Sequence, residues 1–351
     1  MGRLSESDAL GLIKEESLVS LGKLALDKKR ELHKNKITSF VIDRNINYTN
    51  ICWVDCKFCA FGVKKSSDRA YLLTYEEIDK KIDELIEIGG TQILFQGGVH
   101  PLLKIDYYEK LVSHIHNKYP NIFIHGFSAI EIDYIAKVSH ISYRDVLLRL
   151  QKNGMFSMPG AGAEILSDRV RKIISPKKID SQKWLDIHDT AHNIGMHTSA
   201  TMMFGTAESD EEIIEHWRLI RQLQDKTSGF TAFIMWSFQY KNTLLKEEFP
   251  DISKQSSSRY LRLLAVSRLY LDNFKNIQSS WVTQGKHIGQ LSLSFGANDL
   301  GNLMMEENVV RAAGASYRMD KEEMINTIKD IGEIPAKRAV SYTHLTLPTK
   351  A

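Results

Sequence analysis

The 351-residue chain has few cysteines, no long apolar run and little excess of charge of either sign. Three cysteines cannot all pair with one another, which excludes the disulfide framework of a small secreted domain. No segment approaches the roughly 20 apolar residues of a membrane-spanning helix. The 46 basic and 43 acidic residues give a net charge of +3, and the basic ones are dispersed, so we expect no nucleic-acid partner.

The first residues, MGRLSESDALGLIKEE, are polar and contain no apolar core of a secretory signal. We therefore expect a cytoplasmic chain without a membrane partner. Thiols stay reduced in that compartment, where clustered cysteines bind metal or take part in chemistry.

Eight short apolar runs alternate with amphipathic stretches along most of the chain. The runs, each a candidate strand, are residues 48–52, 91–96, 121–127, 155–159, 197–204, 231–238, 276–282 and 291–296. Between them, Thr74 and Glu77 form a capping box before a helical pattern, and Ser209 has the position of another N-cap. The alternation predicts an α/β fold, a (β/α)8 TIM-type barrel over residues 37–335. A doubly wound open sheet is the alternative.

The two ends of the chain do not continue this alternation. Residues 1–36 carry two leucine-rich stripes and are expected to form an N-terminal helical extension packed against the barrel. Residues 336–351 form a tail. Its last part, residues 341–351 (SYTHLTLPTKA), resembles a translated sequencing-adapter artefact and is left out of the functional reasoning.

All the cysteines lie in one short segment, CWVDCKFC, with the spacing C-x3-C-x2-C. Cys52, Cys56 and Cys59 follow the first candidate strand, and barrel enzymes place their chemistry at the C-terminal ends of strands. Thiolates favour iron–sulfur clusters or zinc, and a closed structural zinc site needs a fourth protein ligand. A [4Fe–4S] cluster held by three thiolates would leave one iron open to a substrate or cofactor.

This segment, with Phe58 directly before the last cysteine, resembles the cluster motif of radical S-adenosylmethionine (SAM) enzymes. The resemblance implies that the three cysteines hold a [4Fe–4S] cluster and that SAM binds the open iron through its amino and carboxylate groups. Reductive cleavage of SAM would then yield methionine and a 5′-deoxyadenosyl radical. A non-catalytic protein that binds zinc through the three cysteines is the alternative from another functional class.

Loops after later candidate strands offer residues for the cofactor. In QGGVHP, Gly97 and Gly98 would let the backbone approach a ligand closely, and the pair resembles the radical SAM motif that holds the methionine amino group. Ser128 and Glu131 could reach the cofactor or could form only a capping box. Glu164 follows a glycine-rich loop and could reach the ribose hydroxyls, or could be a solvated residue at a helix start.

Polar and aromatic side chains near the last strands predict a substrate pocket. The candidates are Trp236, Gln239, Trp281, Thr283, Gln284 and Asp299. Flat apolar walls with polar edges suit an aromatic or sugar group, although core packing would also explain the tryptophans and helix capping the aspartate. For proton transfer the candidates are His100, Glu131 and His197; a lone histidine is more often a buried structural residue.

Several segments together resemble the cyclic dehypoxanthinyl futalosine synthase family, of the futalosine route to menaquinone. They are QGGVHP, HGFSAIEI, PGAGAEIL, GMHTSATMMFG, WSFQ, SSWVTQG, GAND and EENVVRAAGA, and the resemblance covers roughly residues 5–335. It implies that the radical removes the ribose C4′ hydrogen of dehypoxanthine futalosine. The carbon radical would attack the benzoate ring, and loss of an electron and a proton would restore aromaticity. It also implies an external reductant such as flavodoxin or ferredoxin. Aminofutalosine synthase and the radical SAM subunits of deazaflavin cofactor synthesis are the alternatives.

Overall fold

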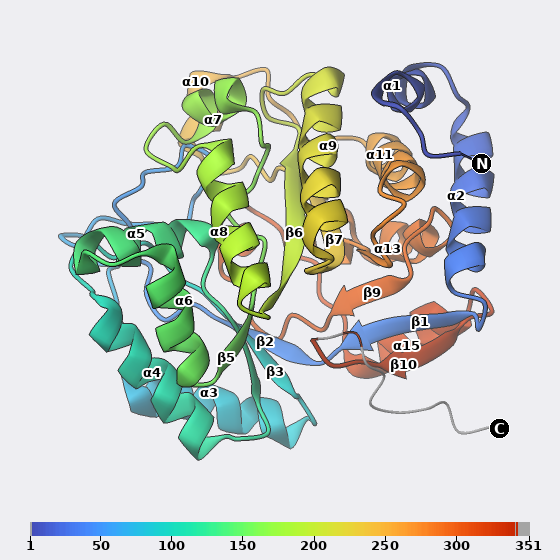
Figure 1. Cartoon of the computed structure of the whole chain (residues 1–351). Helices are drawn as coiled ribbons and strands as arrows, with labels where there is room; N and C mark the ends of the chain where they lie inside the picture. The colour runs from blue at the N-terminus through green and yellow to red at the C-terminus, as the bar shows by residue number, and fades with distance from the viewer. Residues whose placement is uncertain (1, 341, 343–351) are drawn as a thin grey trace.

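One parallel sheet forms the centre of the molecule (Figure 1) in the computed structural model, which describes residues 2–340 and residue 342. Its strands are β1 (Ile37–Val41), β2 (Asp43–Ile46), β3 (Gln92–Phe95), β4 (Phe123–Gly126), β5 (Met155–Met158), β6 (His197–Phe204), β7 (Phe230–Ser237), β8 (Asn276–Gln278), β9 (Asp299–Asn302) and β10 (Ile334–Lys337). Their order is β10-β1-β9-β8-β7-β6-β5-β4-β3-β2, and all neighbours are parallel.

The sheet curls back on itself through the segment that contains β1 and β2. These two strands are separated only by Ile42. β1 pairs with β9 and β10 at one end of the sheet order, while β2 pairs with β3 at the other end. One extended segment therefore joins both ends of the sheet. The predicted α/β barrel class is confirmed, with ten strands within the described residues in place of the predicted eight.

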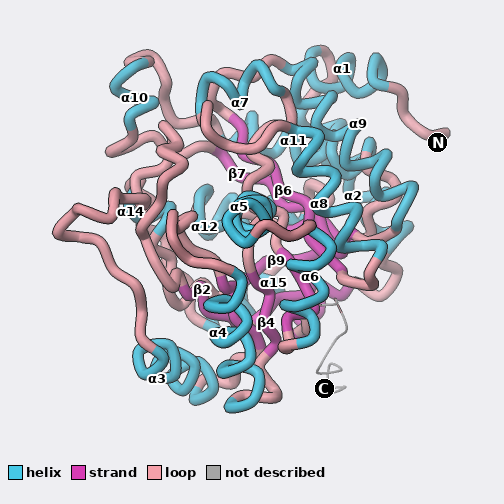
Figure 2. The backbone as a smooth tube through the Cα atoms, turned by 60° about the vertical axis from the view of Figure 1, so that its left-hand side comes forward, coloured by secondary structure: helices cyan, strands magenta, loops and turns pink. Residues whose placement is uncertain are grey.

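Helices cover the outside of the sheet (Figures 1 and 2). They are α1 (Glu6–Lys14), α2 (Leu18–Leu32), α3 (Tyr75–Glu87), α4 (Ile105–Lys118), α5 (Ala129–Ser139), α6 (Tyr143–Lys152), α7 (Asp168–Ile174), α8 (Ser181–Asn193), α9 (Asp210–Thr227), α10 (Leu244–Glu248), α11 (Ser257–Tyr270), α12 (Trp281–Gln284), α13 (Lys286–Leu293), α14 (Val309–Ala312) and α15 (Lys321–Lys329). Parallel neighbours need such crossovers, which bury the sheet. None of the described helices is long and apolar enough to cross a membrane.

The two helices predicted within residues 1–36 are α1 and α2. α1 packs against α9 and α2 against α11, with Ala9, Leu21 and Ala25 fully buried. The division of the chain into extension, barrel and tail stays a prediction. Of the segment 341–351, all but Tyr342 lies outside the described residues.

Six of the eight predicted strands are confirmed as β3 to β8, and two are wrong. Residues 48–52 form only isolated bridges in a loop. Residues 291–296 contain the end of α13, where Ser292 Oγ donates to the carbonyl oxygen of Gly289 (2.6 Å), about one helical turn earlier. Alternating leucine and serine residues therefore fit a helix as well as a strand.

The strands that the apolar pattern missed are β1, β2, β9 and β10. Three of them carry buried polar side chains, among them Ser39, Asp43 and Asp299. A strand whose inward row is polar gives no apolar run, so the search for such runs passed over these segments.

Candidate active site

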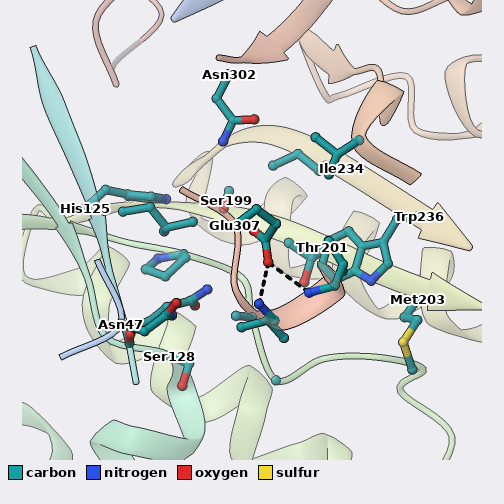
Figure 3. A pocket seen from close by; sticks show the side chains of 18 of the residues that line it. Asn47, His125, Ser128, Ser199, Thr201, Met203, Ile234, Trp236, Asn302 and Glu307 are labelled. Atoms are coloured by element: carbon teal, nitrogen blue, oxygen red, sulfur yellow. Dashed lines mark hydrogen bonds between the residues drawn. The ribbon is translucent and has the colours of Figure 1, made fainter. Parts of the chain in front are cut away.

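The C-terminal ends of the strands and the loops that follow them line one cavity of about 380 Å³. Figure 3 shows side chains from different strands around it, among them His125 of β4, Thr201 of β6 and Trp236 of β7. The sequence analysis predicted the cysteines and the glycine pair at this same end of the strands. One cavity thus receives side chains that are far apart in the chain.

The three cysteines all line this cavity, in the loop between β2 and α3. Cys52 N–H donates to the carbonyl oxygen of Val63 (2.9 Å), which ties the start of the loop to its far side. Asp55, between the first two cysteines, has a left-handed backbone (φ 51°), which a non-glycine residue adopts rarely. The turn that gathers Cys56 and Cys59 beside Cys52 is therefore held by the surrounding structure.

The thiols form a donor set that fits a cluster better than a zinc ion. Burial raises the pKa of Cys52 and raises that of Cys56 to about 12, so a metal must displace their protons. Among the described residues, no group of three or more His, Cys, Asp or Glu side chains is arranged to hold one metal ion. A closed zinc site needs four donors around one point. In a cluster, by contrast, each thiolate binds a different iron.

The glycine pair lies directly against the segment that leads into the cysteines. A Cβ at Gly98 would lie 2.4 Å from the carbonyl oxygen of Ile51, and one at Gly97 would lie 2.9 Å from that of Thr49. Gly98 N–H donates to the Thr49 carbonyl oxygen (2.8 Å). Both glycines line the cavity. Only glycine permits this approach, so the two loops form one backbone unit.

Glu131 lies behind the glycine loop and does not line the cavity, although Ser128 does. Its buried carboxylate accepts hydrogen bonds from Gly97 N–H (3.1 Å), Tyr48 O–H (2.7 Å) and Ser128 N–H (2.7 Å). Burial raises the pKa of Glu131, and the bonds from Ser128 oppose that rise. The structure therefore makes Glu131 a support for the loop and does not bring it to the cavity as a proton acceptor.

Glu164 and Lys178 form a buried ion pair beside the cysteine loop. Glu164 lines the cavity with a left-handed backbone (φ 44°), and Lys178 donates to its carboxylate. The Lys178 Nζ lies 5.0 Å from the centre of the Phe58 ring, which also lines the cavity. Burial lowers the pKa of Lys178, but the Glu164 carboxylate outweighs it and the pKa is raised. A cation and an anion here can meet the two charged ends of an amino-acid group.

Three of the six predicted substrate residues line the cavity: Trp236, Gln239 and Thr283. Trp236 presents a flat wall from the end of β7 (Figure 3). Gln239 follows in the next loop, where its amide donates to Ser237 Oγ (3.2 Å). An aromatic wall beside amide and hydroxyl groups suits a ring that carries polar substituents.

The other three predicted substrate residues are buried and do not line the cavity. Trp281 Nε1 donates to a backbone carbonyl (3.1 Å), and Gln284 Nε2 donates to Ser237 Oγ (2.7 Å). Asp299 forms an ion pair with Arg338. Because Trp281 Nε1, Gln284 Nε2 and the Asp299 carboxylate already have partners inside the protein, these three side chains support the site from outside it.

Neither histidine predicted for proton transfer lines the cavity. His100 is buried, and its Nδ1 accepts a hydrogen bond from Leu102 N–H (3.2 Å) in the turn after the glycine loop. His197 is the exposed first residue of β6, at the opposite end of the strand from the cavity loops. His197 is therefore kept from the site by its position at the N-terminal end of β6, because the cavity loops follow the C-terminal ends of the strands.

The sequence reasoning missed many of the polar or charged residues that line the cavity, and six of them bear on the chemistry. They are Asp43, His125, Lys178, Asn302, Glu307 and Arg338. Glu307 accepts hydrogen bonds from the N–H groups of Val309 (2.8 Å) and Val310 (2.9 Å), and it projects into the middle of Figure 3. A signal was present for the strand residues, because polar side chains at alternate positions of a strand share one face.

Two family models match the chain: the radical SAM superfamily over residues 46–220, and the CofH/MqnC C-terminal region over residues 227–351. The chain is 41% identical to cyclic dehypoxanthine futalosine synthase of Streptomyces coelicolor, over 99% of this chain and 86% of that protein. It is 44% identical to the protein of the same name from Halalkalibacterium halodurans, over 97% and 91%.

A second group of relatives carries another name. The 5-amino-6-(D-ribitylamino)uracil–L-tyrosine 4-hydroxyphenyl transferase 1 of Methanococcus maripaludis is 37% identical, over 97% of this chain and 96% of that protein. Among solved structures, methylornithine synthase (PylB) matches with a TM-score of 0.73 at 17% identity, over 95% and 94% of the two chains. At that identity the likeness shows the fold alone.

Proposed function

The chain belongs to the radical SAM superfamily and, within it, to the cyclic dehypoxanthine futalosine synthase family, and we propose that the cavity described above is the site at which it cyclises dehypoxanthine futalosine. The reaction belongs to menaquinone biosynthesis by the futalosine route. The observation that carries the proposal is that three thiols, with no fourth cysteine in the chain, line the same cavity as the glycine pair.

The family uses a [4Fe–4S] cluster and SAM, which together supply a 5′-deoxyadenosyl radical when one electron is delivered. In this chain Cys52, Cys56 and Cys59 would hold the cluster. The cluster would then be held at the wall of the cavity, because all three cysteines line it. The donor set described above supports this assignment over zinc.

We assign the amino-acid end of SAM to the region between the glycine loop and the Glu164–Lys178 pair. Gly97 and Gly98 line the cavity there, and because their N–H groups bond to Glu131 and Thr49, they would offer carbonyl oxygens to the amino group. Lys178 would meet the carboxylate, and Glu164 the amino group or the ribose hydroxyls. Both side chains are 7% exposed, so these contacts are shielded from water and correspondingly strong.

The substrate would occupy the remaining cavity against Trp236, Gln239 and Thr283. Enclosure matters for this chemistry, since a reactive carbon radical must be kept from water and stray hydrogen donors. The ribose C4′ must also be held close to the adenosyl carbon. The electron would come from an external carrier such as flavodoxin or ferredoxin.

The test is an anaerobic assay of the full chain after reconstitution with iron and sulfide. With a reductant, SAM and dehypoxanthine futalosine, we expect a spirocyclic product by mass detection, together with stoichiometric 5′-deoxyadenosine. Cys56→Ala is the control, and it should lose both the brown cluster absorption and all SAM cleavage. A colourless wild-type protein that retains stoichiometric zinc would overturn the proposal at its first step.

The second candidate function is transfer of the type named for the archaeal relatives, because they are 36–38% identical over most of the chain. The same assay separates the two. Turnover of 5-amino-6-(D-ribitylamino)uracil with tyrosine, and none of dehypoxanthine futalosine, would reassign the substrate while leaving the radical chemistry in place.

A further inference from the structure

A histidine that the reaction scheme does not use faces the cavity from the middle of the sheet. His125 lies on β4, and its ring lines the cavity (Figure 3). Its Nδ1 lies 2.7 Å from the Oγ of Ser157 on the neighbouring strand β5. No hydrogen bond to the other ring nitrogen, Nε2, occurs within residues 2–340 and 342. One nitrogen is therefore fixed by the protein and the other is available to a ligand.

The hydrogen-bond partners of Ser157 and His125 decide which nitrogen of the His125 ring carries the proton. Ser157 is 1% exposed, and His125 is the only partner of its hydroxyl in the described part of the chain. If Nδ1 donated to Ser157, the hydroxyl hydrogen would be buried without an acceptor, which costs free energy. If Ser157 donates to Nδ1, both groups are satisfied. A neutral imidazole has one N–H, so that hydrogen is then on Nε2.

The imidazole stays neutral around physiological pH. Burial, and secondly the Arg338 guanidinium, lower the pKa of His125 to about 3. The Nε2–H group is thus a neutral donor whose natural partner is an oxygen atom. A base that accepts a proton from the substrate would need the opposite tautomer.

The charged side chains around His125 indicate which kind of oxygen atom would accept the hydrogen bond from Nε2. In the sheet register, Asn45 of β2, Leu94 of β3 and His125 lie side by side. Asn45 donates to the carboxyl group of Glu307 (3.2 Å), so an acidic side chain, whose pKa burial raises, lies in the same layer. Asp43, another carboxyl group, lines the cavity two residues earlier on β2.

A substrate carboxylate at this level would be repelled by these acidic neighbours. The two cations that line the same cavity are already paired, Arg338 with Asp299 and Lys178 with Glu164. A hydroxyl group meets both demands, because it accepts from His125 and donates to a carboxylate.

We propose that His125, oriented by Ser157, binds a hydroxyl group of the substrate's sugar by donating a hydrogen bond from Nε2. This inference rests on the proposed function for the identity of the sugar, which is the ribose of dehypoxanthine futalosine. It makes His125 a substrate-binding residue and Ser157 a positioning residue.

The first experiment compares His125→Leu, which removes the donor, with His125→Gln, which keeps an N–H group. Loss of one neutral hydrogen bond predicts a rise of about three- to tenfold in the KM for the substrate with His125→Leu. His125→Gln should recover most of it. SAM cleavage without product should rise in His125→Leu, while the KM for SAM stays at the wild-type value. The control is His287→Gln, at an exposed histidine outside the cavity, which should change none of these.

The second experiment uses substrate analogues that lack the 2′- or the 3′-hydroxyl group. One analogue should bind more weakly than the substrate to the wild-type enzyme but equally well to His125→Leu, because the missing partner is then already absent. If His125→Leu misfolds, Ser157→Ala provides the same comparison with a smaller effect.

The outcomes separate the two proposals. Wild-type turnover with an unchanged KM in His125→Leu, or an equal loss for both analogues in both proteins, overturns the assignment of His125 alone. A wild-type enzyme that gives no cyclised product overturns the proposed function and this assignment with it.

Discussion

Substitution of Gly98 by alanine tests how closely the glycine loop is coupled to the cysteines. The added Cβ would lie 2.4 Å from the carbonyl oxygen of Ile51 and 2.7 Å from the carbonyl carbon of the same residue. It would also lie 3.0 Å from the carbonyl carbon of Asn50. These neighbours are backbone atoms, so no side chain can rotate away to relieve the contact. The loop after β3, the segment before Cys52, or both must shift.

Overpacking of this kind costs about 1–3 kcal/mol, and we expect the upper part of that range because only backbone can yield. The functional cost should be larger. Ile51 is bonded directly to Cys52, so the displacement passes straight into the cysteine loop. A shift of about 1 Å in positioned groups can lower a rate about 100-fold.

The matched control is Gly11→Ala. Gly11 lies inside α1, and an added Cβ there meets nothing within 4 Å. Since alanine is the better helix former, this variant should be about 0.5–1 kcal/mol more stable than wild type and fully active.

The measurements are the urea unfolding midpoint, the iron content after anaerobic reconstitution and the rate of SAM cleavage. Gly98→Ala should lower the unfolding midpoint, the iron content and the cleavage rate, and Gly11→Ala should lower none of them. A Gly98→Ala variant with wild-type stability, full iron content and an unchanged rate would refute the claim that the two loops form one unit.

Three further predictions concern buried charges. Burial raises the pKa of Asp43 to about 6 from its ordinary 3.8, so its ionisation opposes folding as the pH rises through that range. The free energy of unfolding of Asp43→Asn should therefore exceed that of wild type by about 2 kcal/mol at pH 5 and by about 3 kcal/mol at pH 8. Urea titrations measure this difference, and a difference that becomes smaller as the pH rises would contradict the prediction. Lys178→Met leaves the buried Glu164 carboxylate unpaired and should cost about 3–5 kcal/mol of unfolding free energy, most of which adding Glu164→Gln should restore. Arg268 is fully buried and donates hydrogen bonds to three backbone carbonyls and one side-chain amide. Because lysine has too few N–H donors for all four bonds, Arg268→Lys should lower the free energy of unfolding by about 2–4 kcal/mol, which a lower melting temperature would show.

Much of the local structure follows from the sequence alone. The capping boxes of Thr74 with Glu77 and of Ser209 with Glu212 begin α3 and α9, as short-range side-chain chemistry requires. The apolar runs located β3 to β8, because buried parallel strands are apolar on both faces. The cysteine spacing led to a cluster, and the structure brings all three thiols to one cavity.

What the tertiary structure decided is which distant side chains meet. Lys178 reaches Glu164 beside the cysteines, while Glu131, a plausible site residue in the sequence, supports the glycine loop from behind. His197 is separated from the cavity by the direction of its own strand, and His125 is placed in it by the register of β3, β4 and β5. Residue patterns record only neighbours within a helical turn or along a strand. Sheet order and register fix the long-range partners, so the chemistry of the cavity wall could be read only from the folded chain.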